Sequence, residues 1–420
     1  MVSPGWGVSK RVGFRFGILL GALSVLPFPI GTIPKTEWLR DLLEKPLQLA
    51  VSWFAEHALG LADPMIARTG SSDRVWDYVQ LLVIAILAVL GTIGWSVIDR
   101  RRTAYPRLAS AAQIALRYFV ASVMLYYGFS KILKLQFPDL TPGWLDRHVG
   151  EMSPMGFLWT FMGYSRPYTV FAGIAEVVGG ALLLGRRTAT LGALIIVAVM
   201  TNVVVLNFCY DVSAKLYALQ LLVMAVLIAA PNARRLAAAA MGFATAEIEP
   251  RPRMSPRWER TERIGKIAVL CAMACNLYVS FSRELAARNV PIHELSGTWI
   301  VDSFVADGVE HPPLTTDRER WQKVSANPTR LWLVSMTGER DGSILQVDEE
   351  RRRLLLTRAG QDDGKTPETE IWKYTRTGPD HLVIDGAHLG KELHVTLHLA
   401  PEPLLVTRGF HWITDVPFVR

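Results

Sequence analysis

The chain has 420 residues, of which 50% are hydrophobic and only 20% are charged. A soluble domain carries about 25% charged residues, and here the apolar residues come in long blocks. The composition therefore argues against a wholly soluble protein and excludes a disordered one. Three cysteines are too few for a disulfide scaffold. The net charge of the chain is +7: the part before residue 286 carries +11, between the apolar blocks, and the part after it carries −4, so nucleic-acid binding has no support.

Long apolar segments predict membrane-spanning helices, since a bilayer core about 30 Å thick needs roughly 20 apolar residues and leaves the backbone no other partner. Seven segments qualify: residues 13–33, 76–98, 108–133, 167–185, 188–208, 215–231 and 264–282. The first also reads as a signal peptide, but an uncleaved span is favoured because Pro27 and Pro29 end the apolar run and no small-residue cleavage motif follows. The fold class is therefore a mainly α polytopic membrane protein with about seven spans.

Basic residues mark every second connection between these segments, for example Arg100–Arg102 and Arg186–Arg187. Lys and Arg accumulate in cytoplasmic loops. This pattern predicts a multi-pass protein of the inner (cytoplasmic) membrane, with the N-terminus in the cytoplasm and the C-terminal region outside the cell membrane. Residues 37–59 have the spacing of an amphipathic helix on the outer surface, and residues 245–262 read as a cytoplasmic linker.

The region after residue 286 changes to short alternating runs typical of strands, and predicts an all-β sandwich or small barrel. The runs are 297–301, 329–336, 352–357, 371–376, 381–385 and 392–399. Turns are expected at Asp341-Gly342, Asp363-Gly364, Gly378-Pro379 and Asp385-Gly386.

Two ionisable residues inside expected spans form the first candidate site, because a charge at mid-bilayer needs a partner or a water-filled cavity. Arg117 and Glu176 each lie nine residues from the inner end of their span, so we expect them to pair. Asn202 and Gln220 add polar groups at similar depths. The site reads as a proton path or, equally, as a salt bridge that fixes helix register.

A second polar cluster gathers at the outer ends of the spans. Its members are Tyr127, Lys131, Asn207, Tyr210, Asp211 and Lys215. The cluster suits a polar headgroup or a quinone carbonyl. The alternative is a set of snorkelling lysines with interfacial tyrosines.

The order Arg117, then Tyr127-Gly128-Phe129-Ser130-Lys131, then Glu176 before Gly179-Gly180 resembles the DoxX/DoxD-like membrane family. The resemblance covers about 108–235 and implies a four-helix membrane bundle. Some members of the family are implicated in thiosulfate or sulfur oxidation coupled to quinone, or in redox homeostasis. With this bundle, the domains expected are 1–107 with two spans and the outer helix, 108–235, 236–285 with the linker and seventh span, and 286–420 as the extracytoplasmic β-domain.

A shorter resemblance concerns the β-domain, where Gly297-Thr298-Trp299 is similar to the G-x-W motif of lipocalin-like barrels. In such barrels the tryptophan packs under an arginine from the last strand, which implies that role for Arg408. A barrel that holds one small apolar ligand and a small closed core both remain open.

All nine histidines lie outside the expected spans, so a transmembrane haem held by two histidines is excluded. No metal site is expected, since Cys271 and Cys275 lack a second pair of ligands. The resulting hypothesis is a quinone-linked redox component of the membrane. The alternative is a non-enzymatic anchor whose β-domain binds a lipid or an extracytoplasmic protein partner, and a transporter is a weaker third interpretation.

Overall fold

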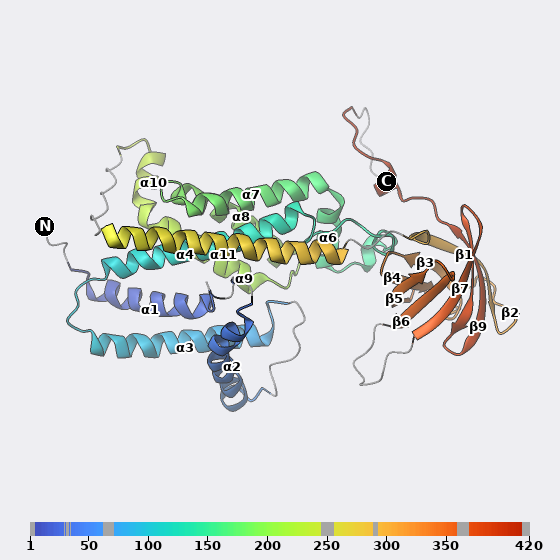
Figure 1. The fold of residues 1–420 in the computed structure, drawn as a ribbon, viewed down its shortest axis with the longest axis horizontal. Coiled ribbons are helices and arrows are strands. Elements are labelled where there is room, and N and C mark those ends of the chain that lie inside the picture. Colours follow the sequence, from blue (N-terminus) through green and yellow to red (C-terminus); the bar gives the residue numbers. More distant parts are fainter. Residues whose placement is uncertain are drawn as a thin grey trace. The chain divides into compact units, whose positions relative to one another are not determined.

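The computed structural model describes residues 5–28, 30, 33, 35–61, 71–244, 256–288, 293–358 and 369–413. The chain divides into two compact units. Unit 1 comprises residues 1–138 and 154–286, and unit 2 comprises residues 139–153 and 287–420. Figure 1 shows helices throughout unit 1 and a curled sheet in unit 2.

Long helices make up unit 1. They are α1 (Val8–Val25), α2 (Glu37–Leu59), α3 (Val75–Ile98), α4 (Pro106–Ile132), α6 (Pro154–Tyr164), α7 (Arg166–Leu184), α8 (Ala189–Cys209), α9 (Lys215–Ala229), α10 (Ala233–Ala240) and α11 (Pro256–Arg288). A 3₁₀ turn, η3 (Ala230–Asn232), joins α9 to α10.

Six of the helical segments in the described part of the chain are long and apolar enough to cross a membrane: Val75–Ile98, Pro106–Ile132, Arg166–Leu184, Ala189–Cys209, Lys215–Ala240 and Ile264–Ala286. The protein is therefore a multi-pass membrane protein. The count is one below the expected seven. The helix over residues 37–59 is confirmed as α2, whereas the expected linker 245–262 is helical from Pro256 onward, as the start of α11.

The expected first span, 13–33, forms helix α1, which has only 18 residues and ends before Pro27. Lys10, Arg11 and Arg15, the basic residues near the start of this expected span, lie within the helix and not in a flanking loop. One of them, Arg15, is 4% exposed and donates hydrogen bonds to Ser96 Oγ at 2.8 Å and to Tyr105 Oη at 2.7 Å. These contacts tie α1 to the end of α3 and the start of α4.

Helices α4, α7, α8 and α9 share one hydrophobic core. Its fully buried members include Val120, Met124, Leu183 and Ile196. Glycines allow close approach between the helices: a Cβ on Gly173 would lie 2.6 Å from the carbonyl oxygen of Gly128. The same contacts set the register of antiparallel α4 and α7, and so decide which polar side chains meet.

Unit 2 is an antiparallel β-barrel, as expected. Its strands are β1 (Gly297–Ala306), β2 (Val309–Glu310), β3 (Trp321–Ala326), β4 (Arg330–Ser335), β5 (Arg340–Asp348), β6 (Arg353–Arg358), β7 (Thr369–Gly378), β8 (His381–His388) and β9 (Lys391–Leu399). Neighbouring strands pair in the order β2-β1-β3-β4-β5-β6-β7-β8-β9, and β1 also pairs with β9 from Trp299↔Leu399 to Ala306↔Leu393, which closes the barrel. A short helix, α12 (Leu404–Thr407), follows β9.

Large side chains fill the barrel interior, among them Trp299, Trp372 and Tyr374. Trp299 is 1% exposed, and its indole Nε1 donates to the carbonyl of Leu295 at 2.9 Å. The expectation that Arg408 lies on the last strand is wrong. That strand ends at Leu399, and Arg408 follows helix α12.

Two of the expected turns are strand interiors. Gly342 lies in β5 opposite Trp332, and Gly386 lies in β8 opposite Trp372. In both pairs the tryptophan ring packs where a Cβ on the glycine would be. These Asp-Gly dipeptides therefore make room for a ring rather than a turn. The turn at Gly378-Pro379 is confirmed, and Asp363-Gly364 lies outside the described residues.

Residues 139–153 belong to the barrel unit, although they lie in sequence between helices α4 and α6 of unit 1. They include α5 (Pro142–Leu145) and the 3₁₀ turn η2 (Val149–Glu151). The Asp146 carboxylate, 9% exposed, accepts from Lys323 Nζ at 2.7 Å and from Arg340 Nη2 at 3.4 Å. The chain therefore enters the barrel unit twice, first at residue 139 and again at residue 287.

Candidate functional site

A buried ion pair lies between helices α4 and α7. Lys131 Nζ is 2.8 Å from both carboxylate oxygens of Glu176. The side chains are 8% and 3% exposed. Because side chains lean toward the N-terminus of their own helix, the two lean toward each other across this antiparallel contact. The pair joins one residue from each of the two expected polar sites.

The expected pairing of Arg117 with Glu176 is wrong. The Arg117 guanidinium donates to the carbonyl of Leu183 at 2.7 and 3.0 Å and to that of Leu184 at 3.3 Å. Leu183 is about 10 Å along α7 from Glu176, at 1.5 Å per residue. Arg117 instead binds the carbonyls that the last turn of α7 leaves open.

The other members of the expected intramembrane site lie on helices other than α4 and α7. Asn202 is exposed on the surface of α8, and Gln220 is half-buried on α9. Of the expected intramembrane site, Glu176 thus forms an ion pair, and its partner is Lys131 at the end of α4.

The expected outer cluster divides into two groups. The Tyr127 ring lies 5.8 Å from Lys131 Nζ and joins the ion pair with Glu176. The remaining members gather at the turn between α8 and α9. There Asn207 Nδ2 donates to the carbonyl of Ala214 at 3.0 Å, Lys215 Nζ contacts Asp211 at 2.7 Å, and Tyr210 packs in a small apolar cluster.

Sequence reasoning missed the carboxylate that organises this turn. Asp73 accepts the backbone N–H groups of Lys215 at 2.8 Å and Leu216 at 2.9 Å, and so satisfies the start of α9. Asp73 is more than 140 residues away in sequence, so local spacing gives no signal for it.

A cavity of about 410 Å³ opens in unit 1 on the side of Tyr127. Its polar lining side chains come from five helices. They are Ser24 on α1, Arg40 on α2, Ser122, Tyr126 and Tyr127 on α4, Tyr217 on α9, and Asn276 on α11. Its apolar walls include Phe28, Phe119, Val123, Met273 and Leu277. A mostly apolar hollow with a few donors is typical of a small-molecule site.

The cavity and the ion pair form one candidate site, because Tyr127 belongs to both. The rings of Tyr126 and Tyr127 lie 5.6 Å apart, and Tyr126 stacks on Phe281 of α11 at 5.5 Å. Sequence reasoning missed Tyr217 and Asn276. Both are polar residues inside apolar spans, the same signal that singles out Arg117 and Glu176.

No group of three or more metal-ligating side chains occurs among the described residues. The polar groups at the candidate site are tyrosine and serine hydroxyls, the Asn276 amide, the Arg40 guanidinium and the buried Lys131–Glu176 pair.

The DoxX family model matches residues 112–208, from α4 to the end of α8. The uncharacterized protein YwoB of Bacillus subtilis is 35% identical over 114 residues, which cover 71% of that protein and 27% of this chain. The chain belongs to the DoxX family. No solved structure matches it.

The DoxX region contains Lys131, Glu176 and Tyr127, and it supplies the α4 wall of the cavity. The other walls come from α1, α2, α9 and α11, which lie outside residues 112–208. The cavity of this DoxX protein is thus completed by elements beyond the shared region.

Proposed function

We propose that this DoxX protein is a quinone-linked redox component of the membrane, and that the tyrosine-lined cavity is its quinone site. The supporting observation is the lining: Tyr126, Tyr127 and Tyr217 bring hydroxyl donors to a hollow whose walls are mostly apolar. A quinone is a flat apolar ring with two carbonyl acceptors. Apolar walls with few donors suit such a ring.

The ion pair gives this site a source of protons. The Lys131 ammonium lies against Tyr127, so it can keep a proton close to the cavity while Glu176 balances its charge. When bound, a quinone supplies the electron-accepting chemistry, and two electrons and two protons convert it to a quinol. Two thiols would supply both the electrons and the protons. Two thiosulfate ions would supply the electrons alone, with the protons taken from water. The chain's part is to bind the ring, exclude water and hold the proton.

We also propose the orientation that the basic loops indicate. The protein lies in the cytoplasmic (inner) membrane with its N-terminus in the cytoplasm and its barrel outside. The loops after α3 and α7 carry Arg100–Arg102 and Arg186–Arg187, and Lys and Arg favour the cytoplasmic side.

The quinone content of the purified protein tests this function. We expect quinone to be extracted from wild-type protein, and expect Tyr127→Phe and Tyr217→Phe to lower its amount because each removes one donor. Tyr78→Phe is the matched control, since Tyr78 is 49% exposed on α3 and outside the cavity lining. Reduction of added quinone by thiosulfate or a thiol is measured on the same preparations.

Wild-type protein that carries no quinone and reduces none would overturn the proposal. Equal quinone content in the Tyr127, Tyr217 and Tyr78 variants would show that the quinone binds elsewhere.

A further inference from the structure

The barrel contains a second cavity, of about 300 Å³, at one end. This end is where β1, β4 and β8 finish and where β3, β5 and β9 begin. At the opposite end Trp299 and Tyr374 fill the interior. The cavity is lined by Phe304, Ala306, Arg318, Glu319, Trp321, Leu333, Ser335, Glu339, Arg340, Asp341, His388, Leu389, Lys391 and Leu393.

The inner part of this cavity is apolar and aromatic. Phe304 and Trp321 meet edge to face at 5.2 Å, and the His388 ring lies 5.5 Å from that of Trp321. Leu333 and Leu393 complete the apolar part. An aliphatic or aromatic body would be removed from water here.

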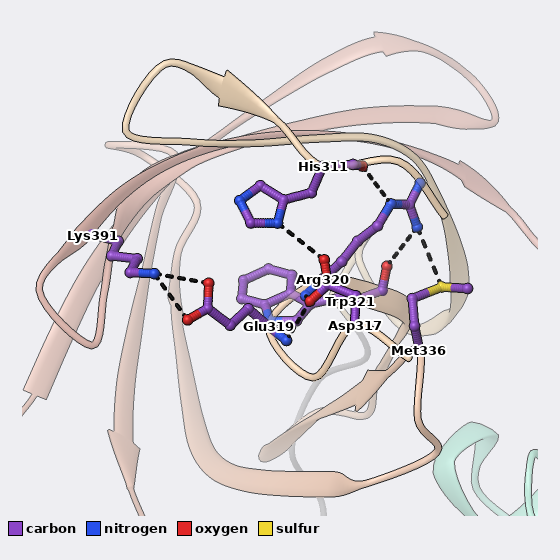
Figure 2. A network of polar contacts seen from close by, with 7 residues as sticks. All are labelled: His311, Asp317, Glu319, Arg320, Trp321, Met336 and Lys391. Atoms are coloured by element: carbon purple, nitrogen blue, oxygen red, sulfur yellow. Dashed lines mark hydrogen bonds and ion pairs between the residues drawn. The ribbon is translucent and has the colours of Figure 1, made fainter. Parts of the chain in front are cut away.

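Hydrogen bonds within the barrel hold the loop of residues 311–320, which forms one side of the cavity rim. Arg320 is 3% exposed and donates to the carbonyls of His311 at 2.9 Å, Trp321 at 3.1 Å and Asp302 at 3.2 Å. Asp317 accepts the backbone N–H of Glu319 at 2.8 Å, and a hydrogen bond with His311 lowers the pKa of Asp317. Figure 2 shows this network without the contact to Asp302.

Every charged side chain on the rim has a partner of opposite charge. Lys391 and Glu319 reach toward each other beside the Trp321 ring, with Nζ 2.7 Å from Oε2 (Figure 2). The other pairs are Arg318–Glu339 at 3.9 Å, Asp341–Arg358 at 3.1 Å, Arg340–Asp146 at 3.4 Å and His388–Glu370 at 2.8 Å. A charged ligand would have to compete with a partner already in place.

We propose that the mouth of the barrel binds a small uncharged amphiphile, with its apolar body against Phe304, Trp321 and Leu333 and its polar end at the Lys391–Glu319 pair. The apolar interior supplies the binding free energy, and the balanced rim selects against net charge. This site is separate from the quinone site of the bundle and does not depend on it.

Photolabelling of the full chain in phosphatidylcholine nanodiscs tests the proposal. The probes are a medium-chain alcohol with a diazirine in its chain, and the carboxylate and amine of the same length. We expect the alcohol to label the peptides over 304–321 and 388–393, and to be displaced by unlabelled alcohol. The carboxylate and the amine should label these peptides less.

Charge-neutralising variants at the rim should reverse the selectivity. Glu319→Gln frees Lys391, so labelling by the carboxylate should rise about twofold to fivefold, the range of one exposed ion pair. Lys391→Gln frees Glu319, and the amine should gain by the same factor. Glu392→Gln is the matched control, because Glu392 is an exposed carboxylate on β9 outside the cavity lining.

Three results would overturn the proposal: alcohol labelling that no competitor displaces, equal labelling by all three probes in the wild type, or an unchanged selectivity in both rim variants. Ala306→Leu narrows the cavity and should lower labelling by the alcohol while the barrel keeps its cooperative unfolding. Unchanged labelling in that folded variant would place the alcohol elsewhere.

Discussion

The Lys131–Glu176 pair is the most deeply buried contact between opposite charges in the DoxX region as described. Two charges removed from water are tolerated because each satisfies the other, and the loss of one partner leaves the other charged and buried. The pair therefore makes the end of α4 and the middle of α7 dependent on each other.

Lys131→Met should destabilise the bundle by about 3–5 kcal/mol, because Glu176 loses its partner. The double variant Lys131→Met/Glu176→Leu should recover much of this loss, since it leaves no buried charge. Thermal unfolding in detergent measures both, with Lys45→Met on the exposed side of α2 as the control. A Lys131→Met protein that unfolds at the wild-type temperature would contradict the account.

His293 should make the stability of the barrel depend on pH. It is 7% exposed, its Nε2 lies 3.1 Å from the carbonyl of Asn327, and burial lowers its pKa below the usual 6.5. The unfolded chain then binds this proton more readily than the folded barrel. The stabilisation of the folded barrel by neutral His293 is therefore fully present above pH 6.5, and it is lost as the pH falls below that value.

We expect the barrel of wild-type protein to lose stability between pH 7.5 and pH 5, and His293→Asn to reduce this loss, with the unfolding midpoint as the measurement. His381→Asn is the control, since His381 is exposed on β8 and should leave the pH dependence unchanged. An identical pH profile in His293→Asn and wild type would contradict the assignment.

Sequence reasoning found the residues of the buried pair but not their pairing. It measured the depths of Arg117 and Glu176 from the inner ends of their spans and took those ends as level. Arg117 lies 11 residues from the start of α4 yet contacts Leu183, next to the last residue of α7, so these two helix ends are not level. The contact of Gly128 with Gly173 sets the true register, and no local pattern in the sequence states it.

At the scale of the elements, the α4–α7 crossing depends on glycines that leave no room for a side chain. A Cβ on Gly173 would lie 2.6 Å from Gly128 O and 2.9 Å from Lys131 Cβ. Such a substitution must push the helices apart and shift Lys131 from Glu176.

Gly173→Ala should therefore lower the thermal stability of the bundle by several degrees and reduce the quinone content. Gly94→Ala on α3 is the matched control, because nothing lies within 4 Å of its added Cβ and alanine favours a helix. Equal stability of the two variants would show that α4 and α7 do not approach closely.

The strands show what periodicity can and cannot predict. Each expected run overlaps a strand, because alternating apolar residues face the barrel core. Gly342 and Gly386 mislead because a glycine after an aspartate signals a turn locally, while its reason here is a tryptophan on the neighbouring strand. Cross-strand packing is a long-range property that the local sequence does not encode.

At the scale of the whole molecule, the chain combines a DoxX bundle with a closed barrel. Because segment 139–153 belongs to the barrel unit, the chain passes between the two units three times. Composition and hydropathy predict the membrane class and the β-domain. They do not predict that a connection between two bundle helices belongs to the barrel, because that depends on Asp146 meeting Lys323 and Arg340.

The central claim is that the barrel lies on the outer side of the cytoplasmic membrane. Alkaline phosphatase fused at Arg420 should be active, because that enzyme matures only outside the cytoplasm, and a green fluorescent protein at the same position should be dark. Fusions after Thr245, in the basic connection before α11, should give the reverse pair of results. A fluorescent fusion at Arg420 together with an inactive phosphatase would place the barrel in the cytoplasm and contradict the proposed orientation.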